Sequence, residues 1–502
     1  MVTASKSRVF ALAAPLALGA CLSSPANDYL YSCANGGSCP TGSGCASDMF
    51  CHPQYVADAG PADAGAYLCA STSPECPAGQ TCESNGLCSA GDAGTELPDA
   101  GDAGSSGSCD LATAFGSSTP IACGTDCAGL GVGDFNHDGY ADVVVAVDTD
   151  DQNRGGLALL LNDGTGNLGS ATTTRALYPC DFEDGLYTTP DALAVGDFNG
   201  DGWPDLALSL QESSQLALAI NNQDGGFTVR GFQPGTSSGC LETEDALYSD
   251  ISAYQSAGDW YLAAVGYGLM DLSGGSVMAV SLVQGAQTLG PFDLIEPAPD
   301  YIPFGLTVGL FDSDPNPGAA VAEENLETEA GQIELFSGTN SGVVSSMASQ
   351  TLICQQGTAR ITSADLNGDG LLDLIAVNDV SNTVEIFYAK AGGFRPGVSF
   401  ATNLGDAGTQ PVGAAVADLD RDGRPDIATV NASGSISILK GLSDGGFLLV
   451  AMQKTTSQTP YWISAVDLED HGANDGGLPD LVVSYISGAG SSAIDVFYNG
   501  CR

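Results

Sequence analysis

The chain has 502 residues and a one-sided charge: 61 Asp and Glu against 13 Lys and Arg give a formal net charge of -48. Because so acidic a chain repels phosphate backbones and anionic headgroups, nucleic acid is excluded as a partner. Hydrophobic residues make up 43% of the chain, which is enough to bury a large core.

The first 20 residues have the pattern of an export signal. Lys6 and Arg8 precede an apolar stretch at 9–18, which is too short for a usual membrane span and is followed by small residues before Cys21. This resembles a bacterial lipoprotein signal, in which cleavage before Cys21 leaves that cysteine to carry the lipid. The alternative is a plain secretory signal with a coincidental cysteine. Both predict export, and the first predicts a lipid anchor in the cell envelope, at the outer membrane or cell surface.

Two cysteine-rich modules follow, each with four cysteines at regular spacing. Segments of about twenty residues cannot bury enough apolar surface to fold alone, so we expect two disulfides per module, in any of three pairings. Zinc is the alternative, but neither paired CxxC motifs nor a His cluster is present. Linkers rich in Asp, Ala and Gly follow each module and predict extended chain. The module cysteines are Cys33, Cys39, Cys45, Cys51, Cys69, Cys76, Cys82 and Cys88.

A nine-residue acidic motif then occurs four times, beginning at Asp134, Asp197, Asp365 and Asp418. Each copy has oxygen-bearing side chains at positions 1, 3, 5 and 9, Gly at position 6, and an aromatic residue or Leu at position 2. Hard cations such as Ca²⁺ take six to eight oxygens, which alternate positions of a tight loop can direct at one centre. An EF-hand would need Glu at position 12, where strand-like runs stand instead, so the motif predicts calcium loops within β-hairpins.

The spacing of these loops predicts a repeat array. Successive loops start 63, 168 and 53 residues apart, and a distorted copy at Asp467 adds a spacing of 49. The interval of 168 is three repeats long and should contain two degenerate copies. One is expected at 311–321, with oxygens at positions 1, 3 and 5 but no ninth Asp, and the other near 251–265. The total is seven units of about 56 residues.

Within each unit a second strand pattern and a Gly-rich turn follow the loop, without amphipathic helices. This predicts an all-β fold, a seven-bladed β-propeller of four-stranded sheets. The expected organisation is a signal at 1–20, a lipidated tether at 21–32, cysteine modules at 33–52 and 69–88 with linkers at 53–68 and 89–108, and a propeller at 109–502.

The two ends of the propeller segment predict how the ring closes. The last unit stops at its third strand, and 110–115 can supply the missing outer strand. Cys109 and Cys501 would then meet, which predicts a disulfide that locks the ring. Five cysteines remain, an odd number, so at least one is free or bonds between molecules, and Cys180 with Cys240 is one possible pair. These five are Cys123, Cys127, Cys180, Cys240 and Cys354.

The loop motif and the strand after it resemble the FG-GAP or VCBS repeat family, whose calcium-loop propellers include the integrin α-subunit head. The resemblance implies about four Ca²⁺ sites, with side-chain ligands at positions 1, 3, 5 and 9 and a backbone carbonyl at position 7. In the seventh unit an insertion before Asp480 departs from the motif. The implied ligands are Asp134, Asn136, Asp138, Tyr140, Asp142, Asp197, Asn199, Asp201, Trp203, Asp205, Asp365, Asn367, Asp369, Leu371, Asp373, Asp418, Asp420, Asp422, Arg424 and Asp426.

Catalytic constellations are scarce, and no catalytic residue or organic cofactor is predicted. None of the three His lies in an HExxH motif, and the GxSxG match at 235–239 falls between units rather than at a strand-to-helix elbow. The resemblance implies a non-enzymatic adhesion or recognition protein that binds an extracellular protein or polysaccharide. A polysaccharide lyase or glycosidase on the same scaffold is the alternative, since paired carboxylates can serve such chemistry. A purely structural envelope component is the third hypothesis.

Overall fold

The chain divides into two compact units, Met1–Ser106 and Gly107–Arg502. The computed structural model describes four short strands in the first unit. In the second it describes residues 109–501, with gaps at 117, 125, 149–154, 176–189, 211–214, 233–246, 257–258, 268–275, 284–292, 296–299, 313, 339–347, 404–408, 456–458, 470–476 and 487–491. The predicted signal, Cys21, residues 54–68 and 91–108 of the linkers, the 235–239 motif, Cys180 and Cys240 lie outside the described residues.

Each cysteine module of the first unit contains one β-hairpin. Strand β1 (Ser43–Cys45) pairs with β2 (Cys51–Pro53), and β3 (Gln80–Cys82) pairs with β4 (Cys88–Ala90). Cys45 is the backbone partner of Cys51, and Cys82 that of Cys88. The two modules therefore share a local fold, and their disulfide pairing stays a prediction.

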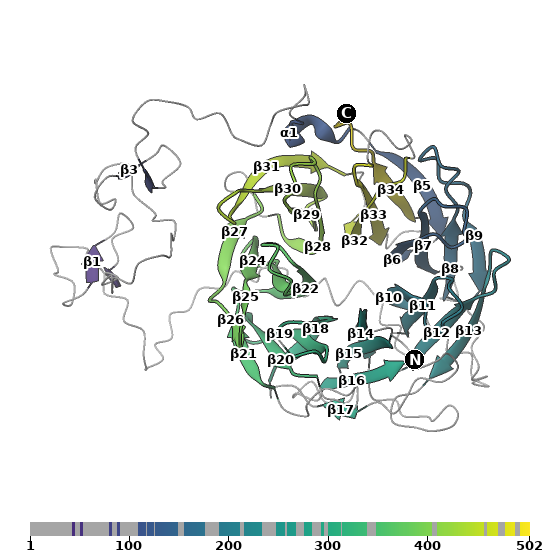
Figure 1. Ribbon diagram of the computed structural model, residues 1–502, viewed down its shortest axis with the longest axis horizontal. Helices are drawn as coiled ribbons and strands as arrows, with labels where there is room; N and C mark the ends of the chain where they lie inside the picture. Colours follow the sequence, from purple (N-terminus) through teal and green to yellow (C-terminus); the bar gives the residue numbers. More distant parts are fainter. Residues whose placement is uncertain are drawn as a thin grey trace, which may run out of the picture. The chain divides into compact units, whose positions relative to one another are not determined.

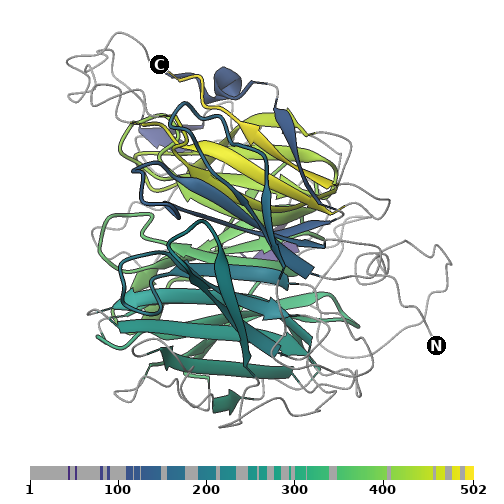
Figure 2. The same ribbon diagram turned by 90° about the vertical axis from the view of Figure 1, so that its right-hand side faces the viewer.

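The described part of the second unit forms seven four-stranded antiparallel sheets, or blades, arranged around a central axis (Figures 1 and 2). Blade 1 consists of β6 (Cys127–Gly133), β7 (Asp142–Asp148), β8 (Gly155–Leu160) and β9 (Thr172–Arg175), and blade 2 of β10 (Pro190–Gly196), β11 (Asp205–Leu210), β12 (Gln215–Asn221) and β13 (Phe227–Phe232). Blade 3 consists of β14 (Leu247–Ser256), β15 (Asp259–Tyr267), β16 (Ser276–Val283) and β17 (Asp293–Ile295), and blade 4 of β18 (Ile302–Gly309), β19 (Gly318–Asn325), β20 (Ala330–Phe336) and β21 (Gln350–Ile353).

Blade 5 consists of β22 (Thr358–Ala364), β23 (Asp373–Asn378), β24 (Thr383–Phe387) and β27 (Val398–Ala401), and blade 6 of β28 (Pro411–Ala417), β29 (Asp426–Asn431), β30 (Ser435–Gly441) and β31 (Phe447–Lys454). Blade 7 consists of β32 (Thr459–Val466), β33 (Asp480–Ile486), β34 (Ser492–Phe497) and β5 (Thr119–Gly124). A small hairpin of β25 (Ala389–Lys390) and β26 (Gly393–Phe394) extends from blade 5. The first strand of each blade lies beside that of the next, and β32 lies beside β6. The all-β prediction is confirmed.

The core consists of the apolar layers between neighbouring blades. Side chains alternate along a strand, so each sheet has two faces to cover. In β7, Val144 and Ala146 pack toward blade 2, whereas Val143 and Val145 pack toward blade 7. All four side chains are 0% exposed. This two-sided burial explains why the second strands read as continuous apolar runs, and each buried valine side chain contributes about 2 kcal/mol.

The ring closes through a different segment from the one predicted. The outer strand of blade 7 is β5, which pairs with β34, whereas 110–115 was expected there. That segment instead forms the one-turn helix α1 (Leu111–Ala114), because Asp110 caps it by accepting the Ala112 N–H at 3.1 Å. Leu111 and Phe115 pack into the core between blades 6 and 7.

Disulfides join Cys109 to Cys501, with their Cα atoms 5.2 Å apart, and Cys123 to Cys127. The first links α1 to the end of blade 7 and holds the two ends of the ring together. The second pair was not anticipated, and it spans the turn between β5 and β6. Cys354 is a free cysteine. Among the described residues no helix is long or apolar enough to span a bilayer.

Every first strand carries a β-bulge near its beginning, where its pairing with the second strand shifts. A bulge redirects the side chains around it. In a ring of first strands, these bulges form one level around the central axis. The shifts lie between Cys127 and Leu130, Pro190 and Leu193, Tyr248 and Asp250, Pro303 and Gly305, Thr358 and Arg360, Pro411 and Gly413, and Pro460 and Trp462.

Blade 4 contains a buried carboxyl group that gives a testable pH dependence. Glu323 is 0% exposed, its Oε2 accepts from the Gln332 amide at 2.9 Å, and its Oε1 has no hydrogen-bond partner. Burial, offset in part by the Gln332 hydrogen bond and reinforced by the Glu334 charge, raises the pKa of Glu323 to about 8. The folded state therefore holds this proton more tightly than the unfolded state, so this group lowers stability as pH rises from about 4.5 to 8.

We expect Glu323→Gln to remove that part of the pH dependence. At pH 8 the variant should be more stable than the wild type by about 2–4 kcal/mol, because no buried charge has to form. Urea denaturation at pH 5, 6.5 and 8 measures this difference. Glu327→Gln, at an exposed position of the same blade, is the control and should leave the pH profile unchanged. A Glu323→Gln profile parallel to that of the wild type would contradict the assignment.

Candidate metal centres in the blade loops

The four acidic loops each connect the first strand of a blade to its second strand, in blades 1, 2, 5 and 6. Because all blades repeat the same strand order, these connections lie on one face of the ring. We call it the loop face. The residue at loop position 2 is buried between blades: Phe135, Phe198, Leu366 and Leu419 are 1%, 1%, 9% and 0% exposed. Each loop is thus anchored by one apolar side chain.

Within a loop, backbone N–H groups turn the acidic side chains inward. In blade 1, Asp134 accepts from the N–H groups of Asp138 and Gly139 at 3.1 and 3.0 Å, and Asp138 accepts from Tyr140 at 3.0 Å. The turn requires a left-handed backbone at positions 4 and 6, where His137 has φ 55° and Gly139 has φ 94°. The other three loops repeat these hydrogen bonds, with the same acceptors at positions 1 and 5.

The ninth-position aspartate is the buried end of each loop. Asp142 is 0% exposed, and its two oxygens accept from the N–H groups of Phe135 at 3.0 Å and Asn162 at 2.8 Å. Burial raises the pKa of Asp142 to about 6, against these hydrogen bonds, and the carboxylates of Asp138 and Asp134 raise it further. Asp373 and Asp426 are held in the same way, and Asp205 accepts from the N–H groups of Asn199 and Asn221. Burial raises the pKa of Asp205 and of Asp373 to about 6 and that of Asp426 to about 7.

This donor set fits a hard cation. Each loop offers oxygens from three or four carboxylates whose like charges disfavour one another, and a divalent ion would relieve that repulsion. The side chains at positions 1, 3, 5 and 9 would hold it. The carbonyls of Tyr140, Trp203, Leu371 and Arg424 stay predicted ligands. Among the described residues, one group of three carboxylates has oxygens within 4.8 Å of one another and could hold a metal ion: Asp418, Asp420 and Asp426.

The loop of blade 6 differs because it has its own cation. The Lys440 ammonium pairs with Asp420 and lies 2.8 Å from Asp422, and the Arg424 guanidinium also pairs with Asp422. Asp420 replaces the Asn found at position 3 of the other three loops. One extra carboxylate is therefore matched by one ammonium. The positions equivalent to Lys440 in blades 1, 2, 5 and 7 hold Leu161, Ile220, Tyr388 and Tyr498, which carry no positive charge.

Replacing Lys440 with Met should therefore strengthen calcium binding at this loop. The variant leaves four carboxylates without the ammonium, so we expect at least about tenfold higher affinity at one site. Calorimetric calcium titration of the full chain measures this change. Lys390→Met, at an exposed position of blade 5, is the matched control and should leave every site unchanged. An unaltered titration of the Lys440 variant would show that the ammonium does not compete with metal.

The remaining three blades lack the complete donor set in their described residues. In blade 4, Gly318 pairs with Gly309 as Asp142 pairs with Gly133. This register places Asp312 and Asp314 at positions 3 and 5, not at positions 1 and 3 as the sequence analysis assumed. In blade 7, Asp480 accepts from the N–H groups of Leu468 and Asn499 at 3.2 and 2.7 Å, as a ninth-position aspartate does. In blade 3, residues 257–258 between β14 and β15 are outside the described range.

Three asparagines that the sequence analysis did not single out position the loops. Asn162, Asn221 and Asn499 lie at or just after the end of the third strand of blades 1, 2 and 7. Their side-chain amides donate to the carbonyls of Leu468, Phe135 and Leu419, at 2.7, 2.9 and 2.8 Å, in the loop of the preceding blade. Each therefore ties a loop to its neighbour. The repeated Asn after a third-strand pattern was the available signal.

The loops of blades 1 and 2 also meet through an aromatic contact. His137 at position 4 of the blade 1 loop stacks on Trp203 at position 7 of the blade 2 loop, with ring centroids 3.9 Å apart and an interplanar angle of 11°. His137 is exposed and Trp203 is half-buried. The loop face thus presents an aromatic pair across blades 1 and 2.

Comparison with known proteins agrees with this repeat. A family model described as an FG-GAP-like repeat matches residues 134–208 and 365–429. Each segment begins at the first aspartate of a loop, and together they contain all four loops. Such repeats commonly bind calcium, are typical of extracellular proteins and are typically non-enzymatic.

No curated protein matches the chain. A solved structure titled "Crystal structure of BBS1N in complex with ARL6DN, soaked with mercury" is similar, with a TM-score of 0.46 and 12% identity over 76% of this chain and 96% of that chain. The family match therefore identifies FG-GAP-like repeats at residues 134–208 and 365–429 of this chain.

Proposed function

We propose that this chain is a non-enzymatic recognition protein of the cell exterior, whose calcium-binding loop face binds an extracellular protein or polysaccharide. The observation that carries the proposal is the construction of that face. Four loops are anchored by buried residues and buried aspartates, while the exposed position 4 and the half-buried position 7 carry side chains that vary among the blades. A rigid support with variable tips is the usual design of a binding surface.

The aromatic pair is the best candidate for the contact itself. Aromatic side chains are enriched at binding hot spots, and they also stack on sugar rings. His137 and Trp203 are held in place by loops whose backbone conformation is set by acidic side chains. Calcium would act as a structural ion here: by relieving carboxylate repulsion it would hold both rings in position.

A binding panel tests the proposal. The full chain is screened against immobilised polysaccharides and extracellular matrix proteins, with calcium and with EDTA. We expect a ligand whose binding needs calcium and falls at least about tenfold in the double variant His137→Ser, Trp203→Ser. Leu448→Ser, a 54% exposed position on an outer strand, is the control. Binding that survives EDTA and the double variant would contradict the role of the loop face.

The same panel addresses the enzymatic alternative. Release of reducing ends or unsaturated sugars from any polysaccharide would show turnover and overturn the non-enzymatic assignment.

The proposed lipid anchor rests on the sequence around Cys21. We expect the wild-type chain to partition with membranes and Cys21→Ser to be released into the soluble fraction. Equal partitioning of the two proteins would remove the anchor from the proposal.

A further inference from the structure

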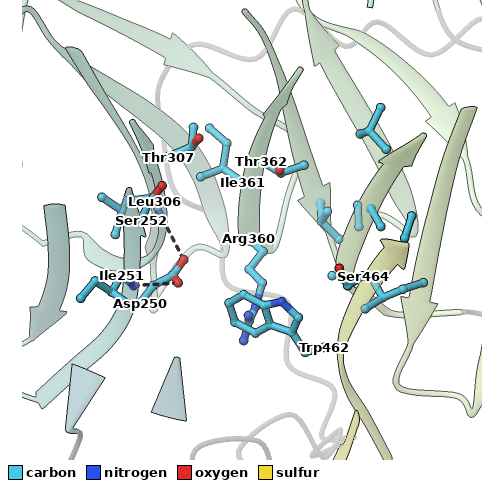
Figure 3. Close-up of a pocket in the computed structure, with 17 residues that line it drawn as sticks. Asp250, Ile251, Ser252, Leu306, Thr307, Arg360, Ile361, Thr362, Trp462 and Ser464 are labelled. Carbon is cyan, nitrogen blue, oxygen red and sulfur yellow. Dashed lines mark hydrogen bonds between the residues drawn. The ribbon is translucent and has the colours of Figure 1, made fainter. Parts of the chain in front are cut away.

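A polar cavity of about 310 Å³ lies among the first strands of blades 3 to 7, and no residue of the acidic loops lines it (Figure 3). A volume of this size suits a small molecule. Its lining includes Asp250, Ser252, Thr307, Arg360, Thr362 and Trp462.

The charged and aromatic residues of this cavity occupy one repeated position. It is the first residue after the β-bulge, and in blades 3 to 7 it holds Asp250, Gly305, Arg360, Gly413 and Trp462. Glycine occupies this position in blades 4 and 6, so the three large side chains come from blades 3, 5 and 7. At Gly305 an added Cβ would lie 3.1 Å from the Cα of Arg360, so β18 and β22 pass close together there. The blades therefore differ from one another in the residue that each places just after its β-bulge.

Arg360 presents hydrogen-bond donors without an acceptor. Its guanidinium lies over the Trp462 ring, 4.0 Å from the centroid, and 4.9 Å from the centroid of the Tyr461 ring. These rings orient the group by cation–π contact but accept no conventional hydrogen bond. Its Nη1 is buried and has no hydrogen-bond partner. Leaving a buried charged donor unsatisfied is costly, which points to an acceptor supplied from outside the chain.

Asp250 provides the opposite charge across the cavity. Its carboxylate is 4% exposed and accepts from the N–H groups of Ile251 at 2.9 Å and Leu306 at 3.1 Å. Burial raises the pKa of Asp250 to about 6, although the Arg360 charge and both hydrogen bonds lower it. The structure records no ion pair between these two described residues, so their charged atoms are separated by more than 4.0 Å. Figure 3 shows the two side chains extending from different strands toward the same space.

We propose that this cavity binds a small zwitterion, such as a free α-amino acid, with its carboxylate on Arg360 and its ammonium toward Asp250. A guanidinium binds carboxylates through paired hydrogen bonds. An anion alone would have to approach a chain of net charge -48, and a cation alone would leave Arg360 without an acceptor. A zwitterion adds no net charge and satisfies both groups. Because Arg360 covers a face of Trp462, that face is closed to sugar stacking, which disfavours a monosaccharide.

The test is calorimetric titration of the full chain with the common L-amino acids and glycine betaine. Acetate, methylammonium and monosaccharides serve as comparison ligands. We expect at least one zwitterion to bind saturably, and to bind at least tenfold more tightly than acetate or methylammonium. Saturable binding of monosaccharides alone, or no binding of any zwitterion at millimolar concentration, would overturn the proposal.

Three variants distinguish a loss of ligand binding from a loss of folding. Arg360→Gln and Asp250→Asn should each weaken binding at least about tenfold, while Arg395→Gln and Asp224→Asn, at exposed positions elsewhere, should not. Gly413→Leu fills the cavity without altering a charge. The nearest atom to its added Cβ would be the Val430 Cγ2 at 3.4 Å, so the fold should survive while binding is lost. Normal binding by a folded Gly413→Leu variant would place the ligand elsewhere.

Discussion

Chelating calcium is expected to lower the unfolding free energy of this protein by about 8 kcal/mol, if three loops are occupied at 100 times their Kd. Each such site contributes about 2.7 kcal/mol. The physical source is the buried ninth aspartate and its acidic neighbours, with which no described Lys or Arg side chain forms an ion pair in blades 1, 2 and 5. Urea denaturation in 1 mM CaCl₂ and in EDTA measures the difference.

A matched pair of variants assigns the effect to individual loops. Asp197→Asn removes a carboxylate from position 1 in blade 2, so about one site's share of the calcium-dependent increment should disappear. Asp312→Asn changes the degenerate loop of blade 4, which has Gly318 at position 9, and should leave the increment intact. Denaturation curves that do not respond to EDTA would show that these loops hold no structural calcium.

Removing the Cys109 to Cys501 disulfide is expected to cost about 6 kcal/mol by the chain-entropy relation. Its sequence separation is 392 residues, so it restricts the unfolded chain far more than the Cys123 to Cys127 bond, whose separation is 4. The chain-entropy relation gives about 2 kcal/mol for the short bond. Paired Cys→Ala variants of each disulfide, compared by urea denaturation under oxidising conditions, measure the two costs.

Amide hydrogen exchange shows which strands lose stability when this disulfide is removed. Without the Cys109 to Cys501 bond, α1 and β5 are held to blade 7 only by packing and by strand pairing with β34. We therefore expect faster exchange in β5 and β34 than in the blades far from the closure. Equal destabilisation by the two paired variants, or uniform exchange around the ring, would contradict a closing role for the long disulfide.

The repeat and its acidic loops were readable from the sequence because they depend on local chemistry. An oxygen-bearing side chain at alternate positions, Gly where φ must be positive, and an apolar run afterwards are all encoded within about fifteen residues. The family match at 134–208 and 365–429 and the all-β fold confirm that reading. Burial of positions 2 and 9 was not predicted from the motif and is seen only in the folded blades.

The prediction that 110–115 forms the outer strand of the last blade was wrong for a physical reason. An outer strand needs only backbone pairing, so sequence pattern distinguishes 110–115 poorly from 119–124. Asp110 caps a helical turn over the first segment, and packing of Leu111 and Phe115 settles the choice. The blade 4 register was likewise decided by the pairing of Gly309 with Gly318 rather than by the acidic residues themselves.

The sequence by itself determined the acidic loops, the repeat they mark and the strands that follow them, because each is specified by neighbouring residues. Only the tertiary structure decided what distant residues do together. It placed Lys440 on the carboxylates of the blade 6 loop and set Asp250, Arg360 and Trp462 at one level of the central cavity. Residues more than a hundred positions apart in the chain meet there because ring closure brings the same position of different blades to one axis.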